Sequence, residues 1–319
     1  MINIGFIGAG SLANAMHYPS VNAMDDVCIK AICDLNEERL QSTAERFHVA
    51  QTYTDYHRML DEVELDAVYV IMPPVFLKPI VLDCLAARKH VFMEKPPGTS
   101  VAEALEMAHA ADHHKCIAMC AFNRRFSPVV VEAKKLVDAR GPITQCMVEF
   151  HKYHIGDAKW DYYNVGMFET DVIHVVDLLR HFGGEVTDVD SYVQTWYSDQ
   201  ENVFNALVRF EGGATGFLTA NRASGTRHER FELHGNGIGA YIRAPQSAEV
   251  YTENKTEPTS LEGSGLAGSD QAYMTYGFYG ESRHFIDCVK TGEQPLTNLF
   301  DAAKSRELVD RILEGGRRP

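Results

Sequence analysis

The stretch INIGFIGAGSLANAM, residues 2–16, decides the fold of this chain. Its first six residues form an apolar strand pattern, and a helical pattern follows after a short turn that contains Gly8 and Gly10. The turn satisfies the pattern G-x-G-x-x-G/A, with Ala13 in the third small position. Gly8 permits a tight turn, Gly10 lets a pyrophosphate approach the backbone, and Ala13 permits close packing of helix on strand. Taken alone, the motif is also compatible with an ordinary tight turn between a strand and a helix.

Asp34 supports the dinucleotide interpretation of this turn. It directly follows the second apolar run, CIKAIC, and lies 24 residues after Gly10. A carboxylate there can accept both ribose hydroxyls of NAD, whereas it would repel the 2′-phosphate of NADP. Asp34 can also serve as the N-cap of the next helix, which is compatible with that role. With the helix start at Ser11 and Leu12 facing the phosphates, we predict NAD as the cofactor, with NADP disfavoured.

The first third of the chain alternates short apolar runs with helical patterns. The runs are INIGFI, CIKAIC, AVYVIM, HVFM and CIAMCA. This alternation predicts βαβ units and a doubly wound parallel sheet, so residues 1–122 are predicted to form a Rossmann domain of the α/β class. Ser100 followed by Glu103 fits a capping box, which predicts where one of its helices begins.

The pattern changes after Phe122, and residues 123–319 are predicted to form a second domain of α+β type. A helix over 128–139, a strand over 143–154 and a long helix over 165–182 precede mainly strand patterns. Hairpin turns are predicted at 211–213 and at Asn236-Gly237, which implies a large mixed or antiparallel sheet. Residues 253–270 lack periodicity and predict a mobile loop. Helices near 282–290 and 300–313 close the chain, and these can pack back on the first domain.

Composition narrows the classes of partner. The chain of 319 residues has a formal net charge of −14, which argues against binding to nucleic acid. Its seven cysteines include no CxxC pair, and no apolar run approaches 18 residues. Strand-like sequence begins directly after Met1, so we expect no leader, no membrane segment and a cytoplasmic protein. His109 and His113 have the spacing of a two-histidine metal face but lack a third ligand, so we predict no metal.

Five further segments, taken in order, resemble one known family. They are AVYVIMPP at 67–74, ARKHVFMEKP at 87–96, FNRRFSP at 122–128, HVVD at 174–177 and RHFIDCVKTGEQPL at 283–296. The whole chain resembles the glucose–fructose oxidoreductase, inositol dehydrogenase and rhizopine catabolism (Gfo/Idh/MocA) family. Each motif is moderately specific, whereas five in order are strong. The resemblance implies a cis peptide bond near Pro96 and Pro97, and a homodimer or homotetramer.

By this resemblance, Lys95 holds the reacting hydroxyl and the nicotinamide ribose, and His174 is its partner in proton transfer. Hydride leaves carbon only as the hydroxyl proton is removed, so a base of near-neutral pKa is needed. Partial burial beside a cationic ring would lower the pKa of Lys95, and histidine titrates near 6.5, so either side chain can be the base. We expect the two to converge, from separate domains, on one oxygen. The alternatives are a solvated lysine and a hydrogen-bonded core histidine.

The chain departs from the family pattern at several of these positions. Many relatives carry an aspartate four residues before this histidine, where this chain has Thr170. Asp171, three residues before His174, still lies on a neighbouring side of the same helical face and can complete the catalytic set. Val172 replaces the usual glycine. In the cofactor loop, Leu77 stands where relatives often have histidine and Pro74 where they have asparagine.

Weaker candidates complete the predicted site. The resemblance implies that Pro73 and Glu94 contact the cofactor, and that Asn123 and Arg124 contact cofactor or substrate; the arginine can instead bridge the domains. Substrate contacts are predicted from Lys95, Asp171, His174 and, between strand and helix, from the four residues Tyr153, Lys159, Trp160 and Tyr163. Aromatic rings suit the apolar faces of sugars, although packing alone can also explain them.

Together these observations predict an NAD-dependent oxidoreductase that acts on a secondary alcohol or carbonyl of a small polyhydroxylated substrate: a sugar, cyclitol or sugar acid. Two alternatives stay open. One is an enzyme that retains NAD and uses transient oxidation to drive elimination or glycoside cleavage. The other is a non-catalytic dinucleotide-binding sensor.

Overall fold

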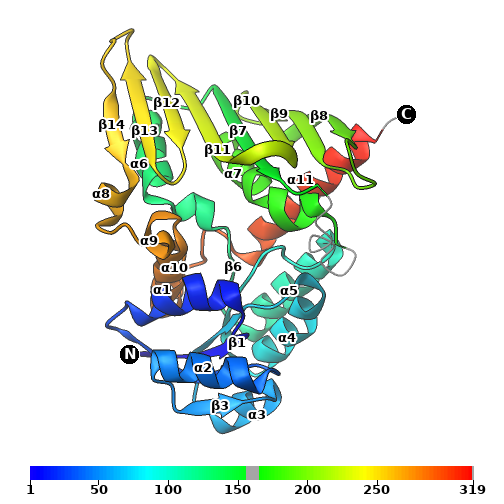
Figure 1. The fold of residues 1–319 in the computed structure, drawn as a ribbon, viewed down its shortest axis with the longest axis vertical. Helices are drawn as coiled ribbons and strands as arrows, with labels where there is room; N and C mark the ends of the chain where they lie inside the picture. The colour runs from blue at the N-terminus through cyan, green and yellow to red at the C-terminus, as the bar shows by residue number, and fades with distance from the viewer. Residues whose placement is uncertain (156–164, 318–319) are drawn as a thin grey trace. The chain divides into compact units, whose positions relative to one another are not determined.

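The computed structural model describes residues 1–155 and 165–317, and the chain divides into two compact units. Unit 1 comprises Met1–Ala121 and Phe278–Lys304. Unit 2 comprises the intervening Phe122–Gly277 and the chain end from Ser305 onward. Figure 1 labels the elements of both units.

Unit 1 is built on a six-stranded sheet whose neighbouring strands are all parallel, which confirms the predicted Rossmann architecture. The strand order is β3-β2-β1-β4-β5-β6, so the order reverses between β1 and β4. Ligands of such sheets bind outside the carboxyl ends of the strands at this reversal. The strands are β1 (Ile2–Ile7), β2 (Val27–Cys33), β3 (Gln51–Tyr53), β4 (Ala67–Val70), β5 (His90–Met93) and β6 (Ala118–Cys120).

The first helix of unit 1 begins with one turn of π-helix, η1 (Ala13–His17), which we call a π-turn and which continues into α1 (Tyr18–Asn22). The other helices are α2 (Glu37–Phe47), α3 (Tyr56–Glu62), α4 (Pro74–Ala86), α5 (Val101–His114) and α10 (Phe278–Thr291). The Ser100 hydroxyl caps α5 as predicted, by accepting the Glu103 N–H at 3.2 Å. The Glu103 carboxylate accepts a hydrogen bond from the N–H of Thr99, one residue before the N–H that a capping box would use.

Aromatic rings from neighbouring strands stack through the core of unit 1. The ring of Tyr69 on β4 lies 4.8 Å from Phe6 on β1 and 4.5 Å from Phe92 on β5, centroid to centroid. Phe285 of α10 packs edge-on against Tyr69 at 5.7 Å. Large buried rings of this kind carry much of the apolar burial of a core. The late segment that contains α10 is therefore part of the core that the first residues of the chain begin.

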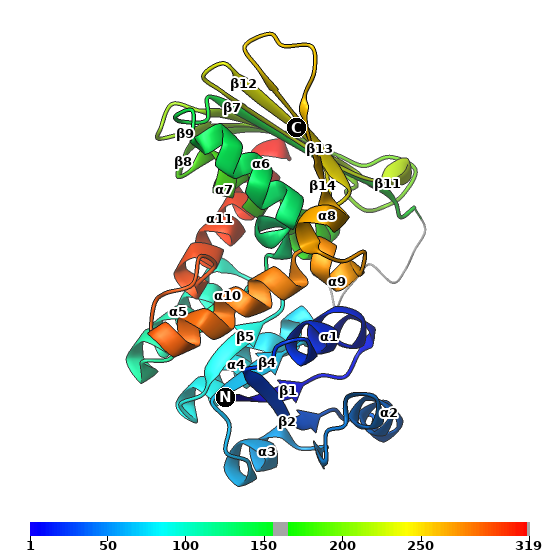
Figure 2. The same cartoon turned by 90° about the vertical axis from the view of Figure 1, so that its left-hand side faces the viewer.

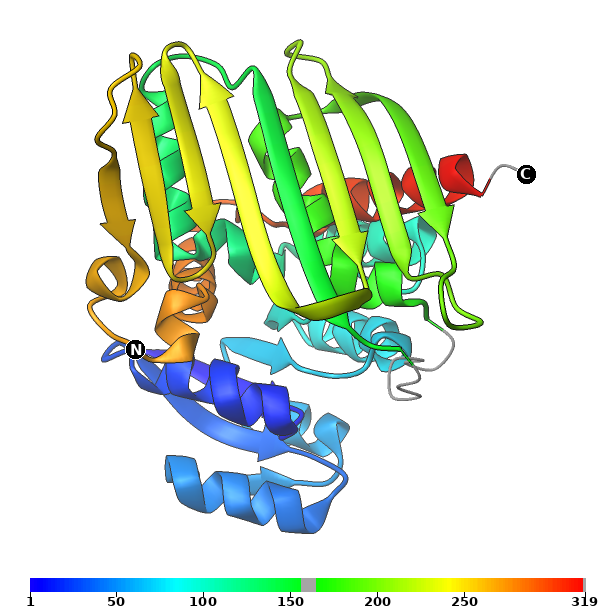
Figure 3. The same cartoon turned by 45° about the horizontal axis from the view of Figure 1, so that its top comes forward.

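Unit 2 is built on an eight-stranded sheet of order β14-β13-β12-β11-β7-β10-β9-β8, onto which Figure 3 looks. Among the described residues β7 and β10 pair parallel and the other neighbours antiparallel, so the predicted mixed sheet is confirmed. Both predicted hairpins are confirmed, and Gly237 has the positive φ that its turn requires. The strands are β7 (Gln145–Tyr153), β8 (Val186–Gln194), β9 (Val203–Phe210), β10 (Thr215–Asn221), β11 (Ala223–Gly235), β12 (Ile238–Arg243), β13 (Ser247–Thr252) and β14 (Thr259–Glu262).

Helices α6 (Pro128–Asp138) and α7 (Ile173–Gly183) lie against one face of this sheet (Figure 2). A π-turn, η4 (Phe168–Val172), leads into α7. The remaining helices are the 3₁₀ turn η2 (Asn123–Phe126), α8 (Gly263–Ala267), α9 (Ala272–Thr275) and α11 (Leu299–Gly316).

The predicted mobile loop over residues 253–270 is wrong. This stretch contains the edge strand β14 and the helix α8. An edge strand bonds to one neighbour and faces solvent, so it needs little apolar alternation; here Leu261 pairs with Ala248 of β13.

Membrane-spanning helices and cysteine pairing can be checked for the described residues. No helix among them is both long enough and apolar enough to cross a bilayer. All seven cysteines are free thiols, and six of them are buried.

A buried ion pair joins two segments of unit 2. Asp177 on α7 is fully buried, and its carboxylate accepts hydrogen bonds from Arg125 Nε at 2.7 Å and Nη2 at 2.5 Å. The Ser305 hydroxyl adds a third bond at 2.7 Å. Removing one partner of such a pair leaves a buried charge without compensation.

We predict that Asp177→Asn lowers the free energy of unfolding by about 3–5 kcal/mol, because the Arg125 guanidinium loses its counter-charge. Urea denaturation followed by circular dichroism measures the change. Glu62→Gln, which breaks an exposed pair with Arg58, is the control and should have a far smaller effect. Equal destabilisation by both variants would contradict a dominant role for the buried pair.

Candidate functional site

The predicted cofactor residues of unit 1 gather at one edge of its sheet. In a parallel sheet, the carboxyl ends of all strands meet at the same edge. The predicted residues that follow a strand end there are Gly8, Gly10, Ser11 and Leu12 after β1, Asp34 after β2, Pro73 after β4, and Glu94 and Lys95 after β5. The topology therefore brings together residues that lie up to 87 positions apart in sequence.

The glycine turn leaves room for a ligand. Gly8 has φ of 109°, and a Cβ on it would lie 2.3 Å from the carbonyl oxygen of Ile71, so this position accepts only glycine. A Cβ on Gly10 would meet nothing within 4 Å among the described residues, and Ser11 and Leu12 are exposed at the helix start. Close packing on one side and open backbone on the other fit a pyrophosphate.

Asp34 links the turn to the second strand. Its Oδ2 accepts the Ala9 N–H at 2.7 Å, and its Oδ1 accepts the Asn36 N–H at 2.8 Å. Arg39 Nη2 lies 3.0 Å from the same Oδ1. The alternative of Asp34 as the cap of α2 is wrong, because the side chain of Asn36 takes that place by accepting the Arg39 N–H. The Asp34 carboxylate therefore helps to shape the turn and stands at the strand end where a ribose diol would bind.

The segment after β4 contributes apolar groups. Pro73 is the half-buried residue before α4, and Pro74 begins that helix. Leu77, where relatives often have a histidine, is fully buried and packs in the core. This part of the edge therefore offers packing surface.

Glu94 is a buried carboxylate with two nearby donors. His17 Nε2 lies 2.8 Å from its Oε1, and the backbone N–H of Lys95 donates to its Oε2 at 3.1 Å. Burial alone would raise the pKa of Glu94, but the hydrogen bond and charge of His17, with the charge of Lys95, outweigh it and hold the pKa below its ordinary value. His17 ends the π-turn and is fully buried, edge-on to Phe92 and Phe278. This pair anchors the backbone from which Lys95 projects.

Lys95 itself is half-buried, and the Lys95–Pro96 peptide bond is cis, as the resemblance implies. Lys95 belongs to unit 1 and His174 to unit 2, so their convergence on one oxygen stays a prediction.

The candidate residues of unit 2 lie on a helix that faces the large sheet. His174 and Asp171 are both buried, three residues apart across the junction of η4 and α7. Lys152 Nζ donates to Asp171 Oδ1 at 2.6 Å, and Arg222 Nη2 lies 2.8 Å from Oδ2. Burial lowers the pKa of Lys152 to about 8, although the Asp171 carboxylate acts in the opposite direction.

Two neighbouring positions have local roles. The hydroxyl of Thr170 donates to the carbonyl of Gly166 at 2.9 Å, four residues earlier and just before the helix begins. Val172, where relatives have glycine, is fully buried. The position four residues before His174 therefore supplies no carboxylate.

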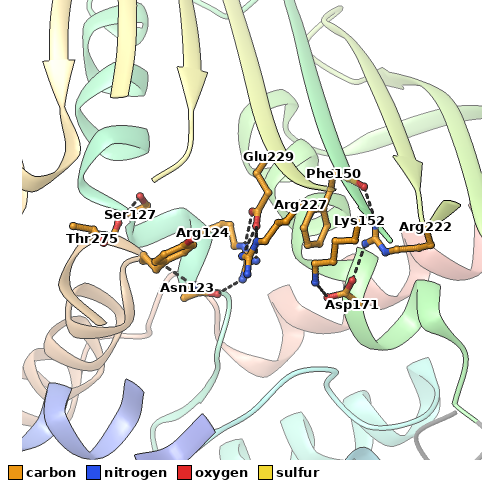
Figure 4. A network of polar contacts seen from close by, with 11 residues as sticks. Asn123, Arg124, Ser127, Phe150, Lys152, Asp171, Arg222, Arg227, Glu229 and Thr275 are labelled. Atoms are coloured by element: carbon orange, nitrogen blue, oxygen red, sulfur yellow. Dashed lines mark hydrogen bonds and ion pairs between the residues drawn. The ribbon is translucent and has the colours of Figure 1, made fainter. Parts of the chain in front are cut away.

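Asn123 and Arg124 form a network inside unit 2 (Figure 4). Asn123 Nδ2 donates to the Tyr276 carbonyl at 2.9 Å, and its Oδ1 accepts from Arg124 Nη1 at 2.9 Å. Arg124 also donates to both oxygens of Glu229, at 3.1 and 3.2 Å. Both residues are buried.

The remaining candidates fall in three places. Tyr153 ends β7 and is 61% exposed, so it is accessible to a ligand. Trp160, with Lys159 and Tyr163, lies outside the described residues. His109 and His113 are exposed on α5, and the described residues contain no group of three or more potential metal ligands.

Several polar residues that contact the predicted site residues belong to no sequence motif, so they were not predicted. They are His17 in unit 1, and Lys152, Arg222, Arg227 and Glu229 in unit 2. His17 could not be identified from the sequence, because the π-turn that orients it leaves no pattern in sequence.

Two family models match the chain. Residues 2–122 match the model described as "Oxidoreductase family, NAD-binding Rossmann fold". Residues 130–238 match the model of the GFO/IDH/MocA C-terminal domain.

Curated proteins and solved structures agree with these matches. A myo-inositol 2-dehydrogenase of Thermotoga maritima is 27% identical over 94% of this chain and 92% of its own length. A scyllo-inositol 2-dehydrogenase (NAD⁺) of Bacillus subtilis is 24% identical over 96% and 92%. A dehydrogenase from Chromobacterium violaceum superposes with a TM-score of 0.89 at 21% identity, over 98% of this chain and 95% of that one. A levoglucosan dehydrogenase in complex with NADH superposes with a TM-score of 0.88 at 21% identity, over 99% and 96%.

We predict that Asp34→Asn weakens NADH binding about tenfold and narrows the preference over NADPH, because the charge that repels a 2′-phosphate is lost while Arg39 stays beside it. Fluorescence titration with both nucleotides measures the two dissociation constants. Asp66→Asn is the control, since that carboxylate also accepts a backbone N–H, from Asn3, but lies before β4 at the amino edge. An unchanged ratio of the two constants in Asp34→Asn would exclude this role.

Proposed function

The chain belongs to the Gfo/Idh/MocA family of NAD-binding oxidoreductases, and from this premise we propose that it transfers a hydride between nicotinamide and a secondary alcohol or carbonyl of a sugar, cyclitol or sugar acid. Two relatives with nearly full coverage are named as inositol dehydrogenases, which supports a polyhydroxylated substrate. Bound NAD supplies the hydride acceptor.

One observation carries the proposal. The glycine turn, the Asp34 carboxylate and Lys95 follow three strands whose carboxyl ends share one sheet edge. The first two fit the pyrophosphate and the ribose of a dinucleotide, and Lys95 adds an ammonium whose backbone is anchored by buried Glu94. A solvated lysine with no role would not need this buried support.

Proton transfer is assigned to Lys95 and His174. A secondary alcohol must lose its hydroxyl proton as hydride leaves its carbon, and a base within hydrogen-bond reach accelerates this step. Lys95 orients the hydroxyl oxygen, and Lys95 or His174 receives the proton. Asp171, one helical turn before His174, completes the proposed set, and Tyr153 is proposed to contact the substrate.

We also infer a homodimer or homotetramer that forms through the large sheet of unit 2. Its face opposite α6 and α7 exposes three aromatic side chains: Tyr192 on β8, Phe217 on β10 and Tyr241 on β12. Exposed apolar side chains gathered on one face are typical of an interface between subunits.

Phe217→Glu is expected to shift the protein toward the monomer, because a charge would be buried in that interface. Light scattering after size exclusion measures the mass against 35.7 kDa for one chain. A monomeric wild-type protein would overturn the assembly proposal.

Lys95→Met is expected to lower kcat by about 10²- to 10⁴-fold while NADH still binds, because the positioned ammonium is lost and the length of the side chain is kept. The assay is NADH absorbance across a panel of cyclitols, aldoses and sugar acids. Lys89→Met is the matched control, since Lys89 precedes β5 at the amino edge and bonds to the Leu65 carbonyl.

The outcomes separate the proposal from its two alternatives. Undiminished turnover of Lys95→Met would refute the catalytic assignment. Product without net NADH would favour an enzyme that retains NAD, and NAD binding with no conversion of any compound would favour a sensor.

A further inference from the structure

A cluster of charged side chains surrounds the ring of Phe150 in unit 2 (Figure 4). We call it the Phe150 cluster, and its charged members are Arg124, Lys152, Asp171, Arg222, Arg227 and Glu229. Four of these are cations that face the ring: Arg222 at 4.3 Å, Lys152 at 4.5 Å, Arg124 at 5.6 Å and Arg227 at 6.0 Å from its centroid. The members come from η2, β7, η4, β11 and the residue before β11.

In the part of the cluster around Glu229, the positive charges exceed the negative ones. Lys152 and Arg222 share the Asp171 carboxylate, and Arg124 and Arg227 share the Glu229 carboxylate. Around Glu229, two cations thus share a single carboxylate, which is an excess of one positive charge among the described residues of this part of the cluster. This local excess stands out in a chain whose net charge is −14.

Burial makes this excess costly. The side chains of Arg124 and Glu229 are 9% and 3% exposed. Removing a cation from water carries a large penalty unless an anion compensates it, and one carboxylate shared by two cations compensates in part. The face of the Phe150 ring adds attraction that is smaller than a full opposite charge.

Arg227 is the open end of the cluster. Its Nε and Nη2 both donate to Glu229 Oε1, while its side chain is 47% exposed. Its guanidinium also lies 5.3 Å from the ring of Tyr276. A guanidinium in this state is held by one buried anion and still presents N–H donors to solvent, which is the geometry for a forked contact with a second anion.

The geometry points to an oxyanion on the substrate. We propose that the Phe150 cluster binds a carboxylate or phosphate ester of the polyhydroxylated substrate, with Arg227 as the contacting cation. The inference rests on the proposed function, which it narrows from neutral and acidic polyols to those with an anionic group. Asp171 of the cluster lies one helical turn from His174, so the oxyanion binds close to the proposed proton-transfer residue.

The test compares matched pairs that differ in the anionic group: D-gluconate with D-glucitol, D-glucuronate with D-glucose, and glucose 6-phosphate with glucose. With saturating NAD, kcat and KM are measured by NADH absorbance. The proposal expects the anionic member of at least one pair to be preferred by about tenfold or more in kcat/KM. Preference within the first two pairs identifies a carboxylate, and preference within the third identifies a phosphate ester.

Arg227→Met tests the contact directly, because this side chain is half-exposed and its loss leaves Arg124 paired with Glu229. We expect KM for the anionic substrate to rise about 10- to 100-fold, the loss typical of one charge-assisted hydrogen bond, with little change in kcat. Arg227→Lys should restore part of the affinity. Arg230→Met, on the same strand and paired with Glu149, is the matched control and should leave KM unchanged.

The failures of the two proposals are distinguishable. Equal use of charged and neutral partners, or an equal effect of Arg227→Met on both, would overturn the oxyanion site and leave the dehydrogenase proposal intact. If no compound reduces NAD, calorimetric titration of gluconate and of glucose 6-phosphate into the NAD-saturated protein decides the site alone. Binding that Arg227→Met abolishes would support it, and no binding at millimolar ligand would overturn it.

Discussion

A buried carboxylate must meet a cation or an N–H donor, and this constraint places most of the candidate residues. In a medium of low polarity, an uncompensated carboxylate costs several kcal/mol. The buried carboxylates with such partners include Glu94 with His17, Asp171 with Lys152 and Arg222, Asp177 with Arg125, and Glu229 with Arg124 and Arg227. Each one holds together segments that are distant in sequence. The backbone before Lys95 and the helix that carries His174 are both positioned in this way.

Much of the fold could be predicted from local pattern. The glycine turn, the alternation of apolar runs with helices and the two hairpin turns depend on residues near one another in sequence, so the sequence predicts them correctly. The short elements β3 and α3 were not predicted, because three and seven residues are too few to show a periodic pattern. Strand β14 was not predicted for another reason. Its polar residues are stabilised by backbone pairing with β13, which composition does not reveal.

The polar surroundings of the site were harder to predict. Lys152 and Arg222 lie 70 positions apart, and the sheet register and the turn before β11 bring them to the same carboxylate. Asp171 could be proposed from its helical spacing to His174, but its two cationic partners could not. The departures at Leu77 and Thr170 now have local explanations, since Leu77 fills the core and Thr170 bonds to the backbone of Gly166, four residues earlier. The carboxylate at Asp171, one position after the usual one, pairs with two cations of the Phe150 cluster, Lys152 and Arg222.

The stacked rings of β1, β4 and β5 have a consequence for how the protein is made. Phe285, which packs edge-on against this stack, is encoded near the end of the chain. A ribosome exposes the six parallel strands long before it has synthesised α10, so during translation the nascent sheet presents an uncovered aromatic surface. The intervening residues Phe122–Gly277 must be synthesised before that surface is covered. Synthesis thus contains a vulnerable interval, in which protection by a chaperone has the greatest value.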